Sequence, residues 1–355
     1  MHPIIINSRT ISEENVPYII AEVSANHNGS IDRAKKTIKA AADTGASAVK
    51  IQTYTPDTMT IDVQSEDFMV SDGIWKGYSL YELYKEAHTP FEWHAELFDY
   101  AQRIGITLFS SPFDETAVDL LESLNAPAYK VASFELVDLP LIAYIAKTSK
   151  PVLMSTGMAS YNEIGEALET ARMAGCHNLA LFHCISSYPT PIEDSNLSSI
   201  QRLKKEFNVQ VGLSDHTLGV TAAISATTLG ATLIEKHFTL NRDEKGPDTS
   251  FSIEPAEFEH LVKSTNDAFL SIGTPLQERV TVEESNKIFR RSLYFVEDLQ
   301  CGDIIRNEHV RRIRPGFGLA PKYLSSVIGK TITQDVKRGD RVSWELLDDK
   351  NQDPC

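Results

Sequence analysis

The chain contains few cysteines, and they are not spaced as paired ligands. The four thiols, at positions 176, 184, 301 and 355, include no CxxC pair, which argues against a zinc site or a disulfide framework and favours reduced thiols. No apolar run approaches the roughly 20 residues of a membrane-spanning helix, so a membrane partner is not expected. The opening residues, MHPIIINSRTISEENVPY, lack a charged start followed by a long apolar core, so we expect no signal peptide and a cytoplasmic protein.

Positive charge is also in short supply. The 355 residues contain 34 Lys and Arg against 49 Asp and Glu, a net charge of −15. This balance argues against nucleic acid as a partner. It does not exclude a small anionic substrate, because a few buried lysines set the local sign of charge. A hydrophobic content of 42% is ample for a globular core, and the length suits one large domain or two unequal ones.

From residue 18 onward, runs of β type alternate with helical runs. Strands are expected at 18–23, 48–53, 106–111, 129–133, 151–156, 179–184, 209–215 and 233–238, with helices at 31–44, 90–103, 116–124, 161–174, 220–229 and 255–270. Mostly continuous apolar strands indicate a parallel sheet covered on both faces. Eight such units in about 250 residues predict a (β/α)8 (TIM) barrel. A doubly wound open sheet is the alternative, which the lack of a GxGxxG after the first strand disfavours.

Two histidines end neighbouring strands of this predicted barrel, where the active sites of such barrels lie. His216 follows GLSD and His237 lies in EKHFT, and each has a carboxylate nearby, Asp215 and Glu235. Two neutral imidazoles at equivalent strand ends predict a divalent metal site with open positions for substrate. The alternative is that the histidines only hydrogen-bond to loop backbone.

Strand parity predicts which side chains share the barrel interior, because alternate side chains face opposite ways. If His237 faces inward, so does Glu235, and Lys236 faces the helices, which argues against Lys236 as a Schiff-base nucleophile. By the same rule Lys50 and Gln52 share a face and can both point inward.

Lys50 and Lys130 are both expected among the strand-end side chains. A buried lysine is tolerated only when it is paired. A phosphate or carboxylate ligand would supply the pair; a structural ion pair with Glu22 or Glu135 is the alternative.

The connection at 54–89 is long for a compact domain, which predicts a lid or, alternatively, a packed excursion with its own short helix. Residues 1–273 would form the barrel, and 274–289 are polar and read as a linker. A small β-rich unit at 290–349 contains two similar pieces, LQCGDIIRNEHV and VKRGDRVSWELL, each with a Gly-Asp turn. Arg314 lies between them in RRIRPGFGLAP and is a candidate for carboxylate or hydroxyl recognition, with a solvated arginine as the alternative. The tail at 350–355 is expected to be disordered.

Ordered motifs along nearly the whole chain resemble those of the sialic acid (nonulosonate) synthase family. They are AEVSANHNG (21–29), VKIQTY (49–54), SSPFD (110–114), YKVASFE (129–135), MSTGM (154–158), SYPTP (187–191), GLSDHT (212–217), EKHFTL (235–240), GPDTSFSIEP (246–255) and RPGFGLAP (314–321). The C-terminal unit is similar to the antifreeze-like (SAF, β-clip) domain of that family. Within the family, SANHNG, IQTYTPDT and GPDTSFS resemble the pseudaminate branch.

This resemblance implies a reaction. Family members condense phosphoenolpyruvate with an open-chain amino sugar and release phosphate, and for the pseudaminate branch the sugar is 2,4-diacetamido-2,4,6-trideoxy-β-L-altropyranose. The resemblance also implies a divalent metal ion (Mn²⁺, Mg²⁺ or Co²⁺) and a domain-swapped homodimer, in which the C-terminal domain of one subunit caps the barrel of the other. Alternatives are a synthase of N-acetylneuraminate or legionaminate, a Schiff-base aldolase, and a non-catalytic carbohydrate- or ice-binding protein.

Site roles follow from the same resemblance. The metal would be held by His216 and His237. Glu135 would help to deliver the water, with Glu22 as the alternative. The sugar would contact Glu22, Gln52, Tyr188, Asp248 and Arg314 of the partner subunit. The phosphate and carboxylate of phosphoenolpyruvate would be held by Lys50, Lys130, Ser111, Ser133, Ser155, Ser186 and Ser214.

Overall fold

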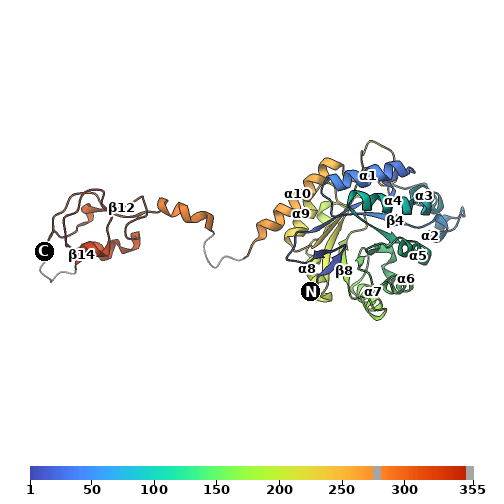
Figure 1. The fold of residues 1–355 in the computed structure, drawn as a ribbon, viewed down its shortest axis with the longest axis horizontal. Helices are drawn as coiled ribbons and strands as arrows, with labels where there is room; N and C mark the ends of the chain where they lie inside the picture. The colour runs from blue at the N-terminus through green and yellow to red at the C-terminus, as the bar shows by residue number, and fades with distance from the viewer. Residues whose placement is uncertain (275–280, 349–355) are drawn as a thin grey trace. The chain divides into compact units, whose positions relative to one another are not determined.

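Eight parallel strands close into a barrel in the computed structural model, which describes residues 1–274 and 281–348 (Figure 1). The closed hydrogen-bonded order is β10-β3-β4-β5-β6-β7-β8-β9. The predicted (β/α)8 barrel is therefore confirmed. Its strands are β3 (Tyr18–Glu22), β4 (Ala48–Thr53), β5 (Thr107–Pro112), β6 (Tyr129–Val131), β7 (Val152–Ser155), β8 (Leu179–Cys184), β9 (Gln210–Asp215) and β10 (Leu233–His237).

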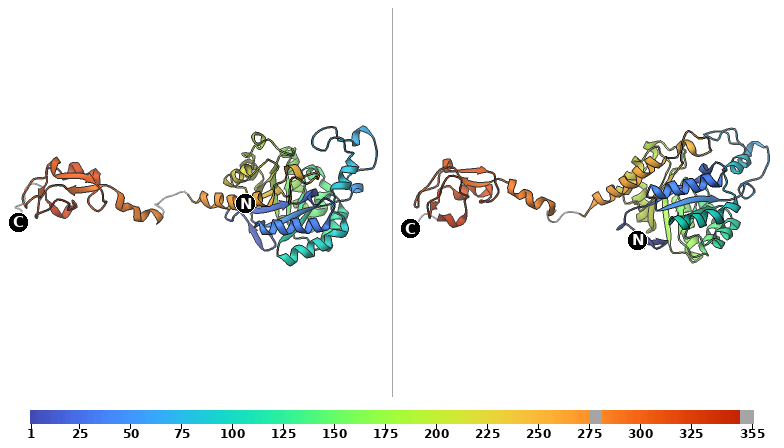
Figure 2. Two further views of the ribbon diagram at one scale, coloured as in Figure 1. Left: turned by 90° about the horizontal axis from the view of Figure 1, so that it is seen from above. Right: turned by 45° about the horizontal axis from the view of Figure 1, so that its top comes forward.

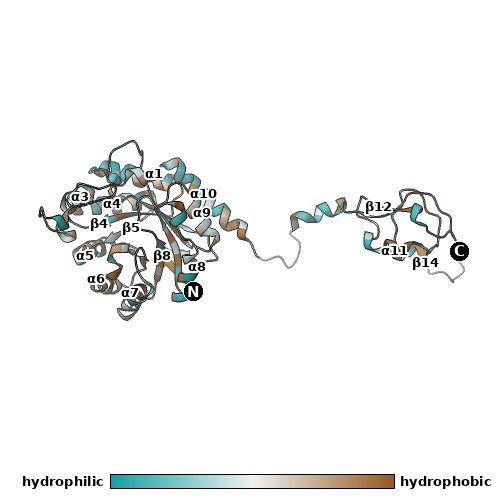
Figure 3. Ribbon diagram, turned by 180° about the vertical axis from the view of Figure 1, so that it is seen from behind, coloured by the Kyte–Doolittle hydropathy of each residue, from teal (hydrophilic) through white to brown (hydrophobic). Residues whose placement is uncertain are grey.

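Helices surround the strands, and side chains cap the first turns of several of them. Ser30 accepts from the amide of Arg33, and Ser160 and Glu163 form a reciprocal capping box, which satisfies amides that a helix start leaves unpaired. Figure 3 shows more hydrophobic colour in α6, whose sequence is LPLIAYIA, than in α1. The covering helices are α1 (Ile31–Asp43), α4 (Phe91–Ile104), α5 (Glu115–Ser123), α6 (Leu139–Ala146), α7 (Tyr161–Met173), α8 (Ser199–Phe207), α9 (Thr221–Thr228) and α10 (Pro255–Ile272).

The barrel has two apolar cores, one on each face of its strands. The larger lies between the strands and the helices and includes Val49 and Leu181. The smaller fills the N-terminal half of the interior and includes Phe109 and Phe182. A hairpin of β1 (Ile4–Ile6) and β2 (Arg9–Ile11) contributes Ile4, Ile6 and Ile11 to the smaller core. The interior is therefore packed at this end, and the opposite end carries the chemistry.

The long connection after β4 contains a short helix, as the alternative interpretation of this segment expected. It comprises α2 (Pro56–Met59), the 3-10 turn η2 (Glu66–Phe68) and α3 (Leu80–Ala87), with Leu83 buried. Figure 2 shows the segment between α2 and α3, in light blue, standing away from the barrel helices.

By its internal contacts, the chain from residue 274 to 355 forms a second compact unit. Its elements are η6 (Thr281–Phe289), β11 (Ser292–Phe295), η7 (Asn307–His309), β12 (Val310–Ile313), η8 (Pro321–Tyr323), α11 (Leu324–Val327), β13 (Thr331–Ile332), η9 (Trp344–Leu346) and β14 (Leu347–Asp348). Residues 281–289, expected as linker, are a 3-10 helix. The rest of that expected linker at 275–280 and the expected tail at 350–355 lie outside the described residues.

The two similar pieces of this unit fold alike. Gly302 and Gly339 have φ of 91° and 101°, and in each turn the aspartate that follows accepts from an amide three residues earlier, at 2.8 Å. The equivalent residues Leu299 and Val336 pair with each other through two backbone hydrogen bonds, of 3.0 and 2.9 Å. The pieces are thus related by an approximate two-fold pairing.

The thiols only partly follow expectation. Cys176 and Cys184 are free and buried. Cys301 is disulfide-bonded, so the expectation of a reduced thiol is wrong for this residue. Among the residues that the structure describes, no helix has the length and apolar content needed to cross a membrane.

Candidate active site

The predicted site residues of the barrel lie at the C-terminal ends of its strands. Several of the strand residues among them lie two positions beyond an apolar residue of the interior core, as Glu22 does beyond Ile20 and Lys130 beyond Ala128. A spacing of two keeps both side chains on the inner face. The residues gathered at this end are Glu22, Lys50, Gln52, Ser111, Lys130, Ser155, Ser214, His216 and His237, with Ser133, Glu135, Ser186, Tyr188 and Asp248 on the segments that follow strands.

Four buried charges of alternating sign form the floor of the site. Lys50 Nζ lies 2.9 Å from Glu22 Oε2 and 3.5 Å from Glu235 Oε1. Lys130 Nζ lies 3.3 Å from the same Glu235 oxygen, which also accepts from Ser214 Oγ at 3.3 Å. The structural ion pair with Glu22, the alternative to a bound anion, is therefore present for Lys50, and Glu235 is a second partner that joins both lysines.

Burial and the neighbouring charges shift the pKa values of these four residues in opposite directions. Burial lowers the pKa of Lys130, and Glu235 offsets the effect only in part. Burial also disfavours the charge of Lys50, but Glu22 and Glu235 outweigh it and raise the pKa of Lys50. Burial raises the pKa of Glu22. The pKa of Glu235 falls, because Lys130 and Lys50 outweigh its burial.

The two predicted metal ligands stand beside each other, with ring centroids 5.4 Å apart. His216 Nδ1 lies 2.9 Å from the carbonyl oxygen of Ile185, so Nδ1 carries the proton and Nε2 keeps its lone pair. His237 Nδ1 is buried and has no hydrogen-bond partner among the described residues. Burial, reinforced by His216, holds the pKa of His237 well below its usual value, so its ring is neutral.

Two adjacent imidazoles, each with a ring nitrogen that no described residue binds, suit a divalent metal ion, so these residues fit the predicted group. The described residues contain no cluster of three or more His, Cys, Asp or Glu side chains arranged to hold a metal. Water and substrate oxygens would therefore have to complete any coordination sphere.

An aromatic wall adjoins the histidines. The Tyr188 ring lies 4.2 Å from that of His216 and 5.2 Å from that of Phe251. Trp75, from the connection after β4, lies 5.6 Å from the Tyr188 ring and donates from Nε1 to the carbonyl of Pro247 at 2.9 Å. This bond ties the connection to the loop that carries Asp248, so the lid interpretation gains a contact at the site.

A second polar network lies beside the floor. Asp248 Oδ2 accepts from Ser24 Oγ and from the amide of Ala25 at 3.3 Å. Gln52 Nε2 donates to Ser24 Oγ at 3.0 Å and to Glu22 Oε1 at 2.9 Å. Burial raises the pKa of Asp248, and the bonds from Ser24 and Ala25 oppose the rise.

Serine hydroxyls and one glycine amide line the remaining rim. Lys50 Nζ donates to Ser111 Oγ at 3.2 Å, and the Gly157 amide donates to Ser133 Oγ at 3.2 Å. A Cβ on Gly157 would collide with Ser186 Oγ and lie 2.7 Å from Ser133 Oγ. Ser155 Oγ is buried without a hydrogen-bond partner in the described ranges. Unpaired buried hydroxyls are costly, so Ser155 marks a position for a bound acceptor.

Glu135 differs from Glu22 in its environment. Burial raises the pKa of Glu135 to about 7, and its Oε2 has no hydrogen-bond partner in the described part of the chain. Glu22, by contrast, is held by Lys50 and Gln52. A carboxyl that titrates near neutral pH and is not held by a cation is suited to proton transfer.

The parity prediction for β10 is confirmed. Lys236 does not join the floor but pairs with Asp215 at 2.7 Å, and Glu257 of α10 also acts on it. Lys236 therefore faces the helices.

Arg314 lies in the C-terminal unit, where it is exposed and precedes a cis proline. Because this unit is separate from the barrel that carries the other site residues, the contact of Arg314 with the sugar stays a prediction.

Sequence reasoning missed several residues of the site. Glu235 was placed on the inner face but given no role, although the same parity argument brings it to Lys50. Cys184 follows Phe182 on the inner face of β8 and lies 3.9 Å from His216 Nδ1. Ser24 and Trp75 lie outside the strands, and no periodicity in the sequence indicates them.

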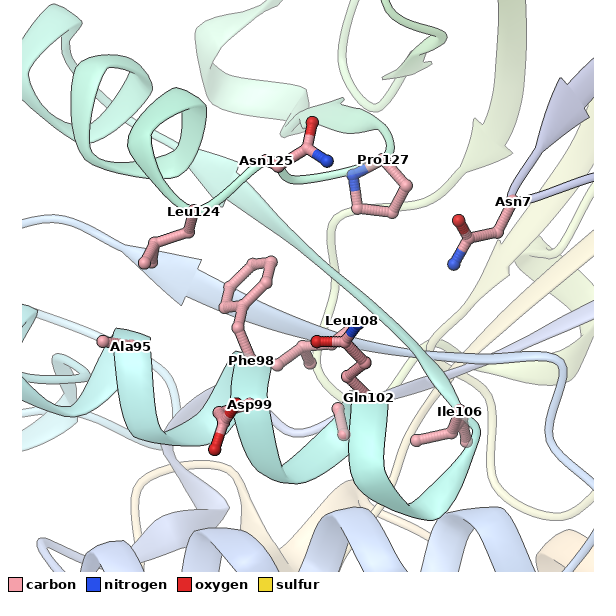
Figure 4. Close-up of a pocket in the computed structure, with 11 residues that line it drawn as sticks. Asn7, Ala95, Phe98, Asp99, Gln102, Ile106, Leu108, Leu124, Asn125 and Pro127 are labelled. Atoms are coloured by element: carbon pink, nitrogen blue, oxygen red, sulfur yellow. The ribbon is translucent and has the colours of Figure 1, made fainter.

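A separate cavity of about 370 Å³ opens elsewhere on the barrel (Figure 4). Figure 4 shows Phe98 of α4 pointing toward Pro127, between Leu124 and Leu108. The cavity lies against α4, the start of β5 and the loop before β6. None of the predicted site residues lines it.

A model of the NeuB family matches residues 37–277, and a model of the SAF domain matches residues 290–348. Pseudaminic acid synthase of Helicobacter pylori is 41% identical over 334 residues, which cover 94% of this chain and 98% of that protein. Pseudaminic acid synthase of Campylobacter jejuni subsp. jejuni serotype O:2 is 44% identical over 326 residues, with coverages of 91% and 94%.

Solved structures agree with the sequence comparisons. A crystal structure of N-acetylneuraminic acid synthetase from Leptospira borgpetersenii serovar Hardjo-bovis, in complex with citrate, superposes with a TM-score of 0.72. It is 30% identical and covers 80% of this chain and 95% of its own.

Proposed function

Since the chain belongs to the NeuB family of sialic acid (nonulosonate) synthases, we propose that it is a pseudaminic acid synthase. It would condense phosphoenolpyruvate with 2,4-diacetamido-2,4,6-trideoxy-β-L-altropyranose and water, giving pseudaminic acid and phosphate. The observation that carries the proposal is the set of groups gathered at one barrel rim: two buried lysines, the unpaired hydroxyl of Ser155 and the adjacent rings of His216 and His237.

Phosphoenolpyruvate would occupy the floor and the serine rim. Lys50 and Lys130 offer cationic donors, and Ser155 offers a hydroxyl that no described residue uses. Charge-assisted hydrogen bonds of this kind are about twice as strong as neutral ones. The full set proposed for the phosphate and carboxylate groups is Lys50, Lys130, Ser111, Ser133, Ser155, Ser186 and Ser214.

His216 and His237 would hold a divalent ion, with Mn²⁺, Mg²⁺ and Co²⁺ as the candidates. When bound, such an ion acts as a Lewis acid on the sugar aldehyde oxygen, where negative charge develops. The chain's own contribution is to fix the ring of His216 and to keep that of His237 neutral. The carbonyl of Ile185 holds the Nδ1 proton of His216, and burial disfavours protonation of His237.

The bond-forming step joins C3 of phosphoenolpyruvate to the sugar aldehyde carbon. The electron pair comes from the enol double bond, which leaves C2 cationic. Water then adds to C2, and phosphate departs from the tetrahedral carbon with cleavage of its C–O bond. We assign removal of the water proton to Glu135, because its pKa of about 7 and its unpaired oxygen suit a base near neutral pH.

The sugar would contact Glu22, Gln52, Tyr188 and Asp248, together with Arg314 of the partner subunit in a domain-swapped homodimer. The barrel surface supports such a cap, because apolar side chains are exposed on segments that follow several strands. Phe134 is 60% exposed, Met158 66% and Leu218 62%. Exposed apolar groups gathered at one rim are typical of a surface that a partner covers. The protein would work in the cytoplasm.

The test is a phosphate-release assay with phosphoenolpyruvate and a panel of sugars, with product mass recorded with and without chelator. The panel is the altro-configured diacetamido sugar, its gluco- and manno-configured counterparts, and N-acetylmannosamine. Chelator-sensitive turnover on the altro sugar alone supports the proposal. Turnover on another sugar would make the protein an N-acetylneuraminate or legionaminate synthase instead.

A Schiff-base aldolase is the alternative that the lysines leave open. Burial lowers the pKa of Lys130, and a lysine with a depressed pKa is the kind that forms imines. Borohydride trapping with a keto acid would label Lys130 if that chemistry occurs. Labelling without chelator-sensitive phosphate release would replace the synthase proposal.

A further inference from the structure

Ser24 has an unusual backbone conformation for its residue type. It directly follows Val23, at the start of η1 (Ser24–His27), and is only 5% exposed. Its φ of 45° lies in the left-handed region, which costs free energy for residues with a Cβ other than Asn and Asp. Non-glycine residues in rare backbone regions persist where the surroundings hold them, and they concentrate at functional sites.

The Ser24 hydroxyl explains what this conformation achieves. Oγ donates to Asp248 Oδ2 and accepts from Gln52 Nε2 at 3.0 Å. One short side chain thereby joins β4 to the loop after β10. A hydroxyl has one hydrogen to donate, so the bond to the carboxylate fixes the direction of both contacts.

The network also determines which atoms remain free. Gln52 Nε2 uses its two hydrogens on Ser24 Oγ and Glu22 Oε1, so its amide cannot flip without placing oxygen against oxygen. Asp248 Oδ2 accepts from Ser24 and from the Ala25 amide. Within residues 1–274, no hydrogen bond engages Gln52 Oε1 or Asp248 Oδ1. Both remaining atoms are acceptors.

We propose that Ser24 is a positioning residue that fixes Gln52 and Asp248 as a pair of acceptors for the amino sugar, and thereby sets which sugar the site accepts. The inference deepens the proposed function and rests on it. A ligand that meets two fixed acceptors must present N–H or O–H donors at matching positions. Acetamido and hydroxyl groups are such donors. A ligand that covers one of these acceptors without donating to it binds less well, because it displaces the water that would otherwise donate to that atom.

The test uses two substitutions at Ser24 and the same two at a control serine. Ser24→Ala removes the hydroxyl and keeps the Cβ, and Ser24→Gly removes both and relieves the left-handed backbone. Ser149 is the control, because it has φ of 60° and lies in the α6–β7 connection, away from the site. Ser149→Ala and Ser149→Gly should leave the kinetics unchanged.

We expect both Ser24 variants to lower kcat/KM for the altro-configured diacetamido sugar by about 10- to 100-fold, the loss typical of a hydrogen bond to a charged group. The KM for phosphoenolpyruvate should stay unchanged, because Ser24 contacts none of the floor lysines. The preference for this sugar over N-acetylmannosamine should narrow, because the two sugars place their donors differently. A general structural defect would instead raise the KM of both substrates.

Crystal structures of the wild type and Ser24→Ala give a second readout that needs no turnover. We expect the Gln52 amide or the Asp248 carboxylate to change orientation in the variant. Unchanged orientations, or a sugar KM that survives both substitutions, would overturn the proposal. So would an active Ser24→Gly beside an impaired Ser24→Ala, because the backbone and not the hydroxyl would then matter. A wild type without phosphate release on any sugar would remove the proposed function, while the crystal comparison would still decide whether Ser24 positions its partners.

Discussion

The two halves of the barrel interior are built on the same strands and differ in chemistry. In the N-terminal half, Ile20, Phe109 and Leu233 belong to an apolar cluster, each 0% exposed. Two residues further along the same strands stand Glu22, Ser111 and Glu235, also buried but polar or charged. The shift from apolar to polar occurs within one repeat of the strand.

The apolar half of the interior therefore contributes mainly to stability, and the polar half mainly to function. The apolar half gains free energy from burial, at about 25 cal/mol per Å² of apolar surface. The polar half gains little or nothing, because desolvation of buried charges offsets their attraction. We therefore expect substitutions in one half to change unfolding, and those in the other to change turnover.

The largest expected effect lies in the polar half, at Glu135. Glu135→Gln should lower turnover by about 10²- to 10⁴-fold, the usual contribution of a positioned general base. The wild-type rate should rise with pH through about 7, the pKa to which burial raises Glu135, and this limb should vanish in the variant. Phosphate release measured against pH checks both. A variant that keeps the limb would move the role to Glu22.

The same pKa has a consequence for stability that can be measured separately. The folded state holds the Glu135 proton more tightly than the unfolded state does, because the folded pKa is raised from 4.5 to about 7. The stability of the folded state should therefore fall as pH rises between these values. Urea unfolding of Glu135→Gln should show a smaller fall over that window than the wild type.

In the apolar half, Phe109→Ala should lower the free energy of unfolding by about 3–5 kcal/mol, the range for removing a buried aromatic ring. Phe109 lies in the interior core and is 0% exposed. Urea unfolding gives the stability, and kinetics at low temperature on the folded fraction should give a near-normal KM for both substrates. A large change in KM with little change in stability would contradict the claim that the apolar half governs stability and the polar half governs turnover.

A double-mutant cycle on the floor sharpens the contrast further. Lys130→Met leaves Glu235 with one cation fewer, and removing one partner of a buried pair is destabilising. Adding Glu235→Leu should recover about 1–4 kcal/mol, because replacing a buried pair by apolar residues is often neutral or stabilising. Calorimetric titration should find phosphoenolpyruvate binding lost in both variants. Stability that fails to recover would give the floor a structural role.

The smallest effect is expected at the edge of the polar half. Trp75→Phe keeps a ring near Tyr188 and loses the bond from Nε1 to the Pro247 carbonyl, a loss of about 0.5–1.5 kcal/mol. We expect the KM for sugar to rise several-fold with no change in unfolding. Limited proteolysis of residues 60–79 checks whether the connection has loosened. An unchanged KM and cleavage pattern would show that the bond does not hold the connection to the site.

The barrel could be predicted from sequence because its signal is repeated. Each strand is a short apolar run, each helix a longer amphipathic one, and the alternation recurs along residues 18–272. Strand ends were less well predicted. The strand expected at 129–133 ends at Val131, because Ser133 begins the 3-10 turn η3 (Ser133–Val137). Turns of this kind carry no periodic signal.

The site residues also divide into those on strands, which could be predicted, and those outside strands, which could not. Lys50, Gln52 and His237 were predictable because strand parity assigns a side to each residue of a strand. Ser24 and Trp75 act from outside the strands, where neither side nor distance follows from the spacing. Arg314 lies in the other unit of the chain, so no rule of register connects it to the barrel.

The charged floor has a consequence for binding thermodynamics. The formal charges of Glu22, Lys50, Lys130 and Glu235 cancel, so these four residues together add no net positive charge to the site. A substrate with several negative charges can enter only with compensating positive charge, taken up as protons or as a cation. Ligand affinity and ion affinity are then linked, and each strengthens the other by the same factor. Substrate binding should accordingly change the number of protons or cations that the protein holds.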